Sequence, residues 1–160
     1  MSNLATTLKE LGKNEEALEY NKEVVRKFTE LLGENHRDTI SSKNLLVDTL
    51  VRLGRIEEAM SFMQQVLEKS KEVSGEDSVD TVIYTQNFIR ILVDNKEFEK
   101  ALDECIKLLE KTERLFGAGA VQTKNTAMML VVIYWGQGEK EKAFKIIEDY
   151  GLHDLIRKKK

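Results

Sequence analysis

The sequence predicts an all-α fold, a right-handed superhelical solenoid of four helix-turn-helix repeats. Three observations predict it: an alanine, a glycine and a threonine each recur every 42 residues. The text around the alanine repeats as well, reading LGKNEEALEY, LGRIEEAMSF, NKEFEKALDE and QGEKEKAFKI. Because a single helical hairpin cannot bury its own apolar stripe, we expect the repeats to stack, with first helices inside and second helices outside.

The 42-residue period is visible at four sets of aligned positions. These are Ala17, Ala59, Ala101 and Ala143; Gly33, Gly75 and Gly117; Thr39, Thr81 and Thr123; and Gly12, Gly54 and Gly138, with Lys96 replacing the glycine in the third repeat. The register predicts an array over residues 1–151, with repeats at about 1–33, 34–75, 76–117 and 118–151. Residues 152–160 then form a C-terminal tail that can act as a cap.

The first helix of each repeat is predicted from apolar residues spaced i, i+1 and i+4, which gather on one stripe of a helix. These triplets are Leu4, Ala5 and Leu8; Leu46, Val47 and Leu50; Phe88, Ile89 and Leu92; and Leu130, Val131 and Tyr134. Asp38 and Asp80 lie just before aligned threonines and are expected to cap the helices that begin there.

The second helix of a repeat is predicted to begin with acidic residues such as Glu15 and Glu57, which favour the positive end of the helix dipole. Helical segments are expected over residues 17–32, 59–73 and 101–116. The glycine after each segment tolerates the left-handed backbone that ends a helix. The aligned alanine is expected where two helices approach too closely for a larger side chain.

Residues 3–39 read NLATTLKELGKNEEALEYNKEVVRKFTELLGENHRDT. This text resembles the consensus of tetratricopeptide repeats, in the longer variety found in kinesin light chains and related scaffold or sensor proteins. The resemblance covers residues 2–150, and it departs from the family at residues 117–120, where GAGA replaces an acidic loop. It implies a non-enzymatic protein-interaction scaffold that binds a peptide or partner segment in a concave groove.

The resemblance places ligand contacts on the non-core faces of the first helices. By the 42-residue register these positions are Asn44, Asp48 and Arg52; Gln86, Asn87 and Arg90; and Met128, Val132 and Trp135. Asn and Gln side chains can donate to and accept from a peptide backbone, and Arg90 can pair with a carboxylate. The alternative is that these are solvated polar residues on a helix face, and the residues alone leave both interpretations open.

The first helix of the fourth repeat is apolar on nearly every face, because residues 127–135 read AMMLVVIYW. Stacking covers its core triplet, so Met128, Val132 and Trp135 are expected to point into the groove. The favoured covers are the tail from Leu152 to Ile156 or a further repeat, ahead of a bound peptide or a second copy. The alternative function is therefore an oligomerisation module that seals this repeat against another copy or domain, in a monomer or weak homodimer.

Composition and motifs predict no enzyme activity, no cofactor and no metal site. A net charge of −3 argues against a nucleic-acid partner, and the nine-residue apolar run is too short to cross a membrane. His36 and His153 lack a partner at metal-ligand spacing, and Cys105 falls on a core face as a structural thiol. The single cysteine and the absence of a signal pattern predict a cytoplasmic protein.

Overall fold

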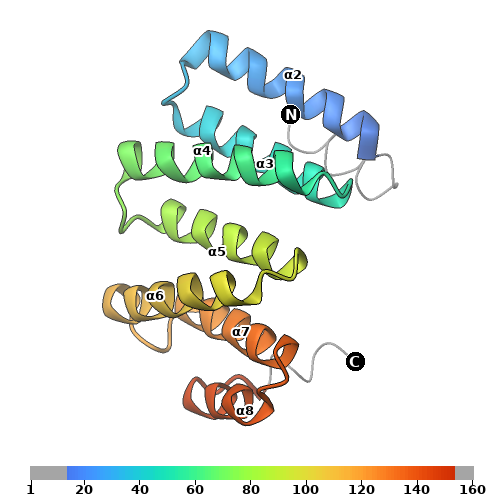
Figure 1. The fold of residues 1–160 in the computed structure, drawn as a ribbon. Helices are drawn as coiled ribbons and strands as arrows, with labels where there is room; N and C mark the ends of the chain where they lie inside the picture. Colours follow the sequence, from blue (N-terminus) through green and yellow to red (C-terminus); the bar gives the residue numbers. More distant parts are fainter. Residues whose placement is uncertain (1–13, 154–160) are drawn as a thin grey trace. The chain divides into compact units, whose positions relative to one another are not determined.

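A computed structural model describes residues 14–153, and this range contains seven α-helices and no strand (Figure 1). The helices are α2 (Asn14–Leu32), α3 (Arg37–Arg52), α4 (Ile56–Ser74), α5 (Val79–Asp94), α6 (Phe98–Phe116), α7 (Val121–Gly136) and α8 (Lys140–Asp149). The predicted all-α class is confirmed. The predicted core triplet at Leu4, Ala5 and Leu8 and the turn at Gly12 lie outside the described residues.

The helices reproduce the period read from the sequence. The first helices α3, α5 and α7 begin at residues 37, 79 and 121, which are 42 residues apart, and each is 16 residues long. The second helices α2, α4 and α6 are each 19 residues long, whereas α8 has 10 residues. The expected helix ends before Gly33, Gly75 and Gly117 are confirmed, since all three glycines have positive φ.

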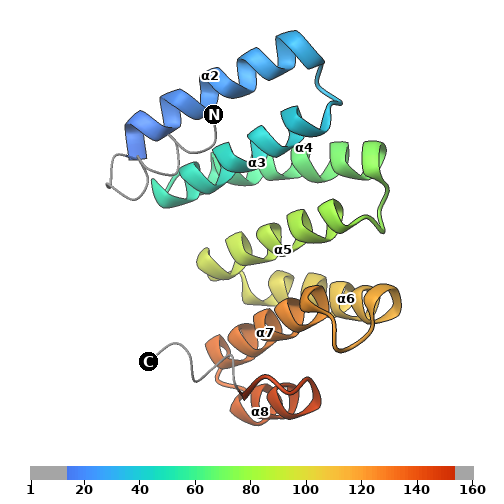
Figure 2. The ribbon, with the colours of Figure 1, turned by 180° about the vertical axis from the view of Figure 1, so that it is seen from behind.

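The chain divides into two compact units, residues 1–84 and 85–160, with the division inside α5. In the first unit α3 packs against both α2 and α4, and in the second unit α7 packs against both α6 and α8 (Figures 1 and 2). A first helix is therefore held between two second helices in each unit.

The buried core follows the predicted pattern. The aligned alanines Ala17, Ala59, Ala101 and Ala143 are all fully buried. Leu46, Val47 and Leu50 on α3 are at most 2% exposed, so this i, i+1, i+4 triplet faces the interior as expected. In the two later triplets Phe88 and Tyr134 are half-buried.

The aligned threonines fasten the loop between repeats. The hydroxyls of Thr39, Thr81 and Thr123 donate to the carbonyl oxygens of the glycines six residues earlier, each at 2.8 Å. All three threonines are at most 2% exposed. The recurrence of glycine and threonine thus has a single cause, because each hydroxyl satisfies the carbonyl at the end of the preceding helix.

The predicted caps at Asp38 and Asp80 are wrong. The Asp38 backbone N–H donates to His36 Nδ1 at 3.2 Å, so the imidazole caps α3. Ser78 Oγ accepts from the Thr81 N–H at 3.1 Å in the same way at the start of α5. Asp80 instead accepts from Arg37 Nε at 3.2 Å, since a carboxylate inside the first turn reaches a neighbouring side chain more readily than its own backbone.

Lys96 holds the turn that glycine forms in other repeats. Its φ is 61°, close to the 71° of Gly54 and the 81° of Gly138. The backbone hydrogen bonds also match, because Glu97 N–H donates to Leu92 O at 2.8 Å as Arg55 N–H donates to Leu50 O at 2.9 Å. The turn therefore survives the loss of glycine at a strain of about 1 kcal/mol.

Thr123→Val is expected to lower the free energy of unfolding by about 0.5–1.5 kcal/mol, because the Gly117 carbonyl loses the Thr123 hydroxyl and keeps only the Ala120 N–H at 3.2 Å, while the side-chain volume stays similar. Urea denaturation followed by circular dichroism measures the change. Thr123→Ser keeps the hydroxyl and should lose less than the valine variant. Equal stability of the valine variant and the wild-type chain would show that the loop does not need this hydrogen bond.

Candidate functional site

A cavity of about 280 Å³ lies between α5 and α7 in the second unit. It is lined by Gln86, Asn87, Arg90, Val93, Asp94, Met128, Met129 and Val132. We call this cavity the groove. Five of the residues predicted from the register line it together, since they repeat at spacings of three and four residues that share one helix face.

The floor of the groove is apolar and comes largely from α7. Met128 and Met129 are half-buried, and Val132 is 49% exposed. Other faces of α7 carry Leu130 and Ile133, which are buried in the core. The sequence of α7 is therefore apolar on nearly every face because one face packs against the core of the second unit and another lines the groove.

Gln86 forms hydrogen bonds between two helices, a role that the sequence did not predict. Its Nε2 donates to the Gln122 carbonyl oxygen at 3.0 Å and to Thr126 Oγ1 at 2.9 Å, which ties α5 to α7. Both amide hydrogens are engaged within the protein, so this group cannot also donate to a peptide. Gln86 was expected to contact a peptide through both its amide donor and its carbonyl acceptor. Only the side-chain carbonyl oxygen is left to accept from a peptide.

The polar side of the groove carries both signs of charge. Arg90 is exposed at the lining, and Asp94 lines the same cavity one helical turn later. Asp94 was missed from the sequence, although its spacing of four residues from Arg90 was the available signal. Because the lining carries a carboxylate as well as a guanidinium, the groove does not present positive charge alone to an acidic ligand.

Trp135 does not line the groove with Met128. It lies at the end of the second unit, where its ring contacts the Phe144 ring edge-on, with centroids 5.5 Å apart and planes at 68°. A second cavity of about 590 Å³ opens there between α7 and α8. Val132 lines both cavities, because it sits between the two faces of α7.

The remaining predicted residues belong to the first unit. Asn44 and Asp48 are half-buried on α3, and Arg52 Nε lies 3.3 Å from Asp48 Oδ2. This ion pair joins successive turns of one exposed helix face, where such a pair stabilises the helix slightly.

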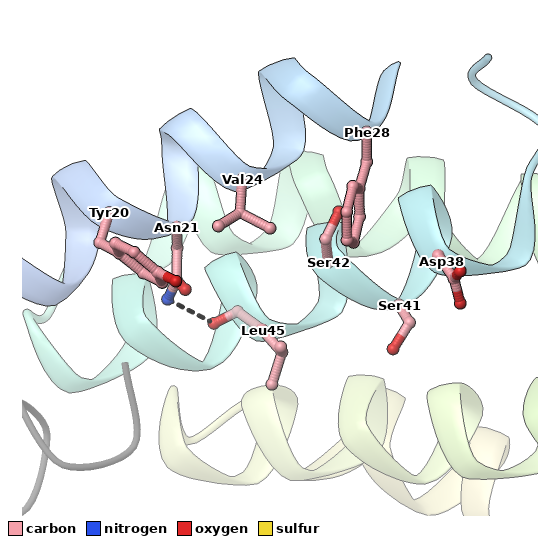
Figure 3. Close-up of a pocket in the computed structure, with 8 residues that line it drawn as sticks. All are labelled: Tyr20, Asn21, Val24, Phe28, Asp38, Ser41, Ser42 and Leu45. Carbon is pink, nitrogen blue, oxygen red and sulfur yellow. Dashed lines mark hydrogen bonds between the residues drawn. The ribbon is translucent and has the colours of Figure 1, made fainter. Parts of the chain in front are cut away.

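The first unit has a cavity of about 340 Å³ between α2 and α3 that the sequence did not predict (Figure 3). Figure 3 shows Tyr20, Val24 and Phe28 reaching from α2 toward α3. Asn21 Nδ2 donates to the Leu45 carbonyl oxygen at 3.5 Å, drawn as the dashed line in Figure 3, and to Thr49 Oγ1 at 2.8 Å. The sequence predicts α2 as an outer helix and carries no signal for a cavity beside it. Asn21 is only 3% exposed and acts here as a tie between two helices, like Gln86 in the second unit.

Cys105 is fully buried on α6, and its Sγ donates to the Thr126 carbonyl oxygen at 3.5 Å. Burial raises the pKa of the thiol to about 12, because the apolar surroundings disfavour the thiolate. The expected core position is confirmed. Within residues 14–153 no cluster of three or more His, Cys, Asp or Glu side chains is arranged to hold a metal ion.

Alkylation of Cys105 by iodoacetamide at pH 8 is expected to be at least about a hundredfold slower in the native protein than in the urea-unfolded chain, because only the thiolate reacts. Mass spectrometry of timed samples measures the rate. A native rate within a few-fold of the unfolded rate would show that the thiol is accessible.

A family sequence model described as tetratricopeptide repeat matches residues 1–72. No curated protein matches the chain. Proteins with this repeat generally serve as protein–protein interaction scaffolds and are typically not enzymes. Among the described residues, no helix has the length and apolar character needed to cross a membrane.

Two solved structures show the same fold. The first, of nearly identical TPR-like repeats from a protein described as a kinesin light chain of Podosopora anserina, has a TM-score of 0.80 and 17% identity, and covers 92% of this chain and 70% of that one. The second, BtubC (BKLC) from P. vanneervenii, has a TM-score of 0.81 and 18% identity, and covers 98% of this chain. The chain spans only 63% of the length of BtubC. The chain therefore has the all-α solenoid fold of these two structures, and its first 72 residues are similar to the tetratricopeptide repeat.

Proposed function

We propose that this protein is an interaction module that binds a segment of a partner protein in the groove between α5 and α7. The observation that supports it is the cavity of about 280 Å³ whose walls come from two consecutive first helices. Pockets that combine an apolar floor with a few polar groups are the usual form of a ligand site.

The lining favours a partner segment that inserts an apolar side chain. Met128 and Met129 are flexible and polarisable, so they can adapt to anchors of different shape. Asn87, Arg90 and Asp94 border this floor with one amide and two opposite charges. Because Gln86 donates within the protein, recognition depends on the apolar anchor more than on hydrogen bonds to Gln86.

A phage-displayed library of random peptides, panned on the purified wild-type chain, tests this function. Enriched peptides are synthesised with a fluorophore, and their affinity is measured by fluorescence anisotropy. Met128→Asp is expected to weaken binding at least about tenfold, since it places a charge where the apolar anchor is buried.

Val121→Asp provides the matched control, because Val121 is 70% exposed at the start of α7 and lies outside the groove. This variant should bind the selected peptides as the wild-type chain does. Failure to enrich any peptide, or equal binding by the Met128→Asp variant, would contradict the groove as the binding site.

A further inference from the structure

Asp94 is the last residue of α5 and places a carboxylate at the lining of the groove. It is exposed, and it lines the cavity together with Met128 and Val132 of α7. Within the described part of the chain, the Asp94 carboxylate forms no ion pair. The nearest lysine in the sequence, Lys96, lines a different cavity with Phe98. The Asp94 carboxylate is therefore accessible to a cationic group of a ligand.

The other polar side chains that line the groove are already engaged within the protein. Gln86 Nε2 donates both of its hydrogens to α7. Asn87 and Arg90 also have polar or electrostatic partners within the chain. Asp94 is thus the lining residue whose charge is not balanced by a neighbour among the described residues, so the groove favours a ligand that carries positive charge.

The sign of the charge at this position differs between repeats. By the 42-residue register, Arg52 at the end of α3 corresponds to Asp94, and Asp48 corresponds to Arg90. In α3 the arginine stands at the negative end of the helix and its Nε lies 3.3 Å from Asp48 Oδ2, an order of charges that stabilises a helix. In α5 the order is reversed, so the Asp94 carboxylate stands at the negative end of its own helix. Helix stability does not explain an aspartate at this position, whereas binding of a cation does.

The apolar floor next to Asp94 sets the second requirement for a ligand. Met128 and Met129 are half-buried, and the neighbouring Val93 is half-buried on the wall that α5 provides. A segment that fits both features carries an apolar side chain beside a basic one. The methylene stem of a lysine or arginine can also pack along the apolar floor while its charged end reaches the carboxylate.

We propose that the groove binds a basic segment of a partner protein, in which a lysine or arginine beside the apolar anchor pairs with Asp94. This proposal rests on the function proposed above and adds the charge of the partner. An acidic segment is disfavoured, because the Asp94 carboxylate repels it while Arg90 already has a partner within the chain.

Random dodecapeptides enriched by phage display on the wild-type chain, and weakened by Met128→Asp, are the probe. They are expected to carry lysine or arginine within two residues of their apolar anchor. Asp94→Asn should weaken their binding about threefold to tenfold in 50 mM NaCl, measured by fluorescence anisotropy. The difference between the two proteins should shrink in 500 mM NaCl, because salt screens an exposed ion pair.

A charge exchange tests the pairing directly. Asp94→Lys should bind peptides whose basic residue is replaced by glutamate more tightly than the wild-type chain binds them. Asp103→Asn is the matched control, since Asp103 is exposed on α6 and does not line the groove, and it should bind the original peptides as the wild-type chain does. Asp94→Asn should unfold at the same or a higher temperature than the wild-type chain, which separates weaker binding from loss of folding.

The outcomes separate this proposal from the function on which it rests. Peptides that depend on Met128 but carry no basic residue beside their anchor overturn the proposal and leave the groove as a binding site. Equal binding by the wild-type chain and Asp94→Asn does the same. If no peptide is enriched, or if Met128→Asp does not weaken binding, the groove function fails and this proposal fails with it.

Discussion

Replacement of Leu50 by alanine is expected to lower the free energy of unfolding by about 2–5 kcal/mol. Leu50 is 1% exposed on α3, the helix that packs against both α2 and α4 in the first unit. Removing its side chain loses buried apolar surface and leaves a cavity that two flanking helices can close only in part.

Leu31→Ala is the matched control, because Leu31 is 78% exposed on α2 and loses the same atoms. Its free energy of unfolding should stay within about 0.5 kcal/mol of the wild-type value. Guanidinium titrations of the three proteins, followed by circular dichroism at 222 nm, measure both changes. Similar losses for the two variants would mean that α3 is not the buried centre of its unit.

Gly136→Ala is expected to cost about 1–3 kcal/mol of stability, although alanine normally favours a helix. Gly136 is the last residue of α7, and a Cβ there would lie 2.6 Å from Cε1 of the Phe98 ring at the start of α6. The ring would have to rotate or the two helix ends would have to separate.

A second substitution isolates this clash. Phe98→Leu removes the ring atoms, so the double variant Gly136→Ala with Phe98→Leu should be less destabilised than the sum of the two single variants. Thermal unfolding of all four proteins gives the interaction free energy. Additive losses would show that the close approach of Gly136 and Phe98 is not what keeps glycine at this position.

The helices were predictable because their signals repeat. Glycine ends three second helices, and the 42-residue offset fixes where α3, α5 and α7 begin. The caps were not predictable in the same way, because Asp, His and Ser can all serve at a helix start and only geometry selects among them. His36 and Ser78 therefore replaced the expected aspartates.

The sequence predicts which residues line the groove but not which contacts they make. Register placed Arg90 and Met128 on facing helix surfaces, which the structure brings to one cavity. Register cannot show that Gln86 is already bonded to α7, since that bond depends on the separation of two helices. The 42-residue register also cannot show that the Trp135 ring contacts α8, because that contact is with Phe144, a residue of a different helix.

The loop in which Thr123 donates to the Gly117 carbonyl, like its counterparts at Thr39 and Thr81, is closed by residues only six positions apart. The hydrogen bond that closes each loop involves no residue of another repeat, although Arg37 in the first loop also pairs with Asp80 in the next. Gene duplication or recombination that joins two such loops in register therefore adds or removes a whole repeat without damaging the joint. Repeat number can thus change during evolution by steps of 42 residues, while the chemistry of each groove drifts independently.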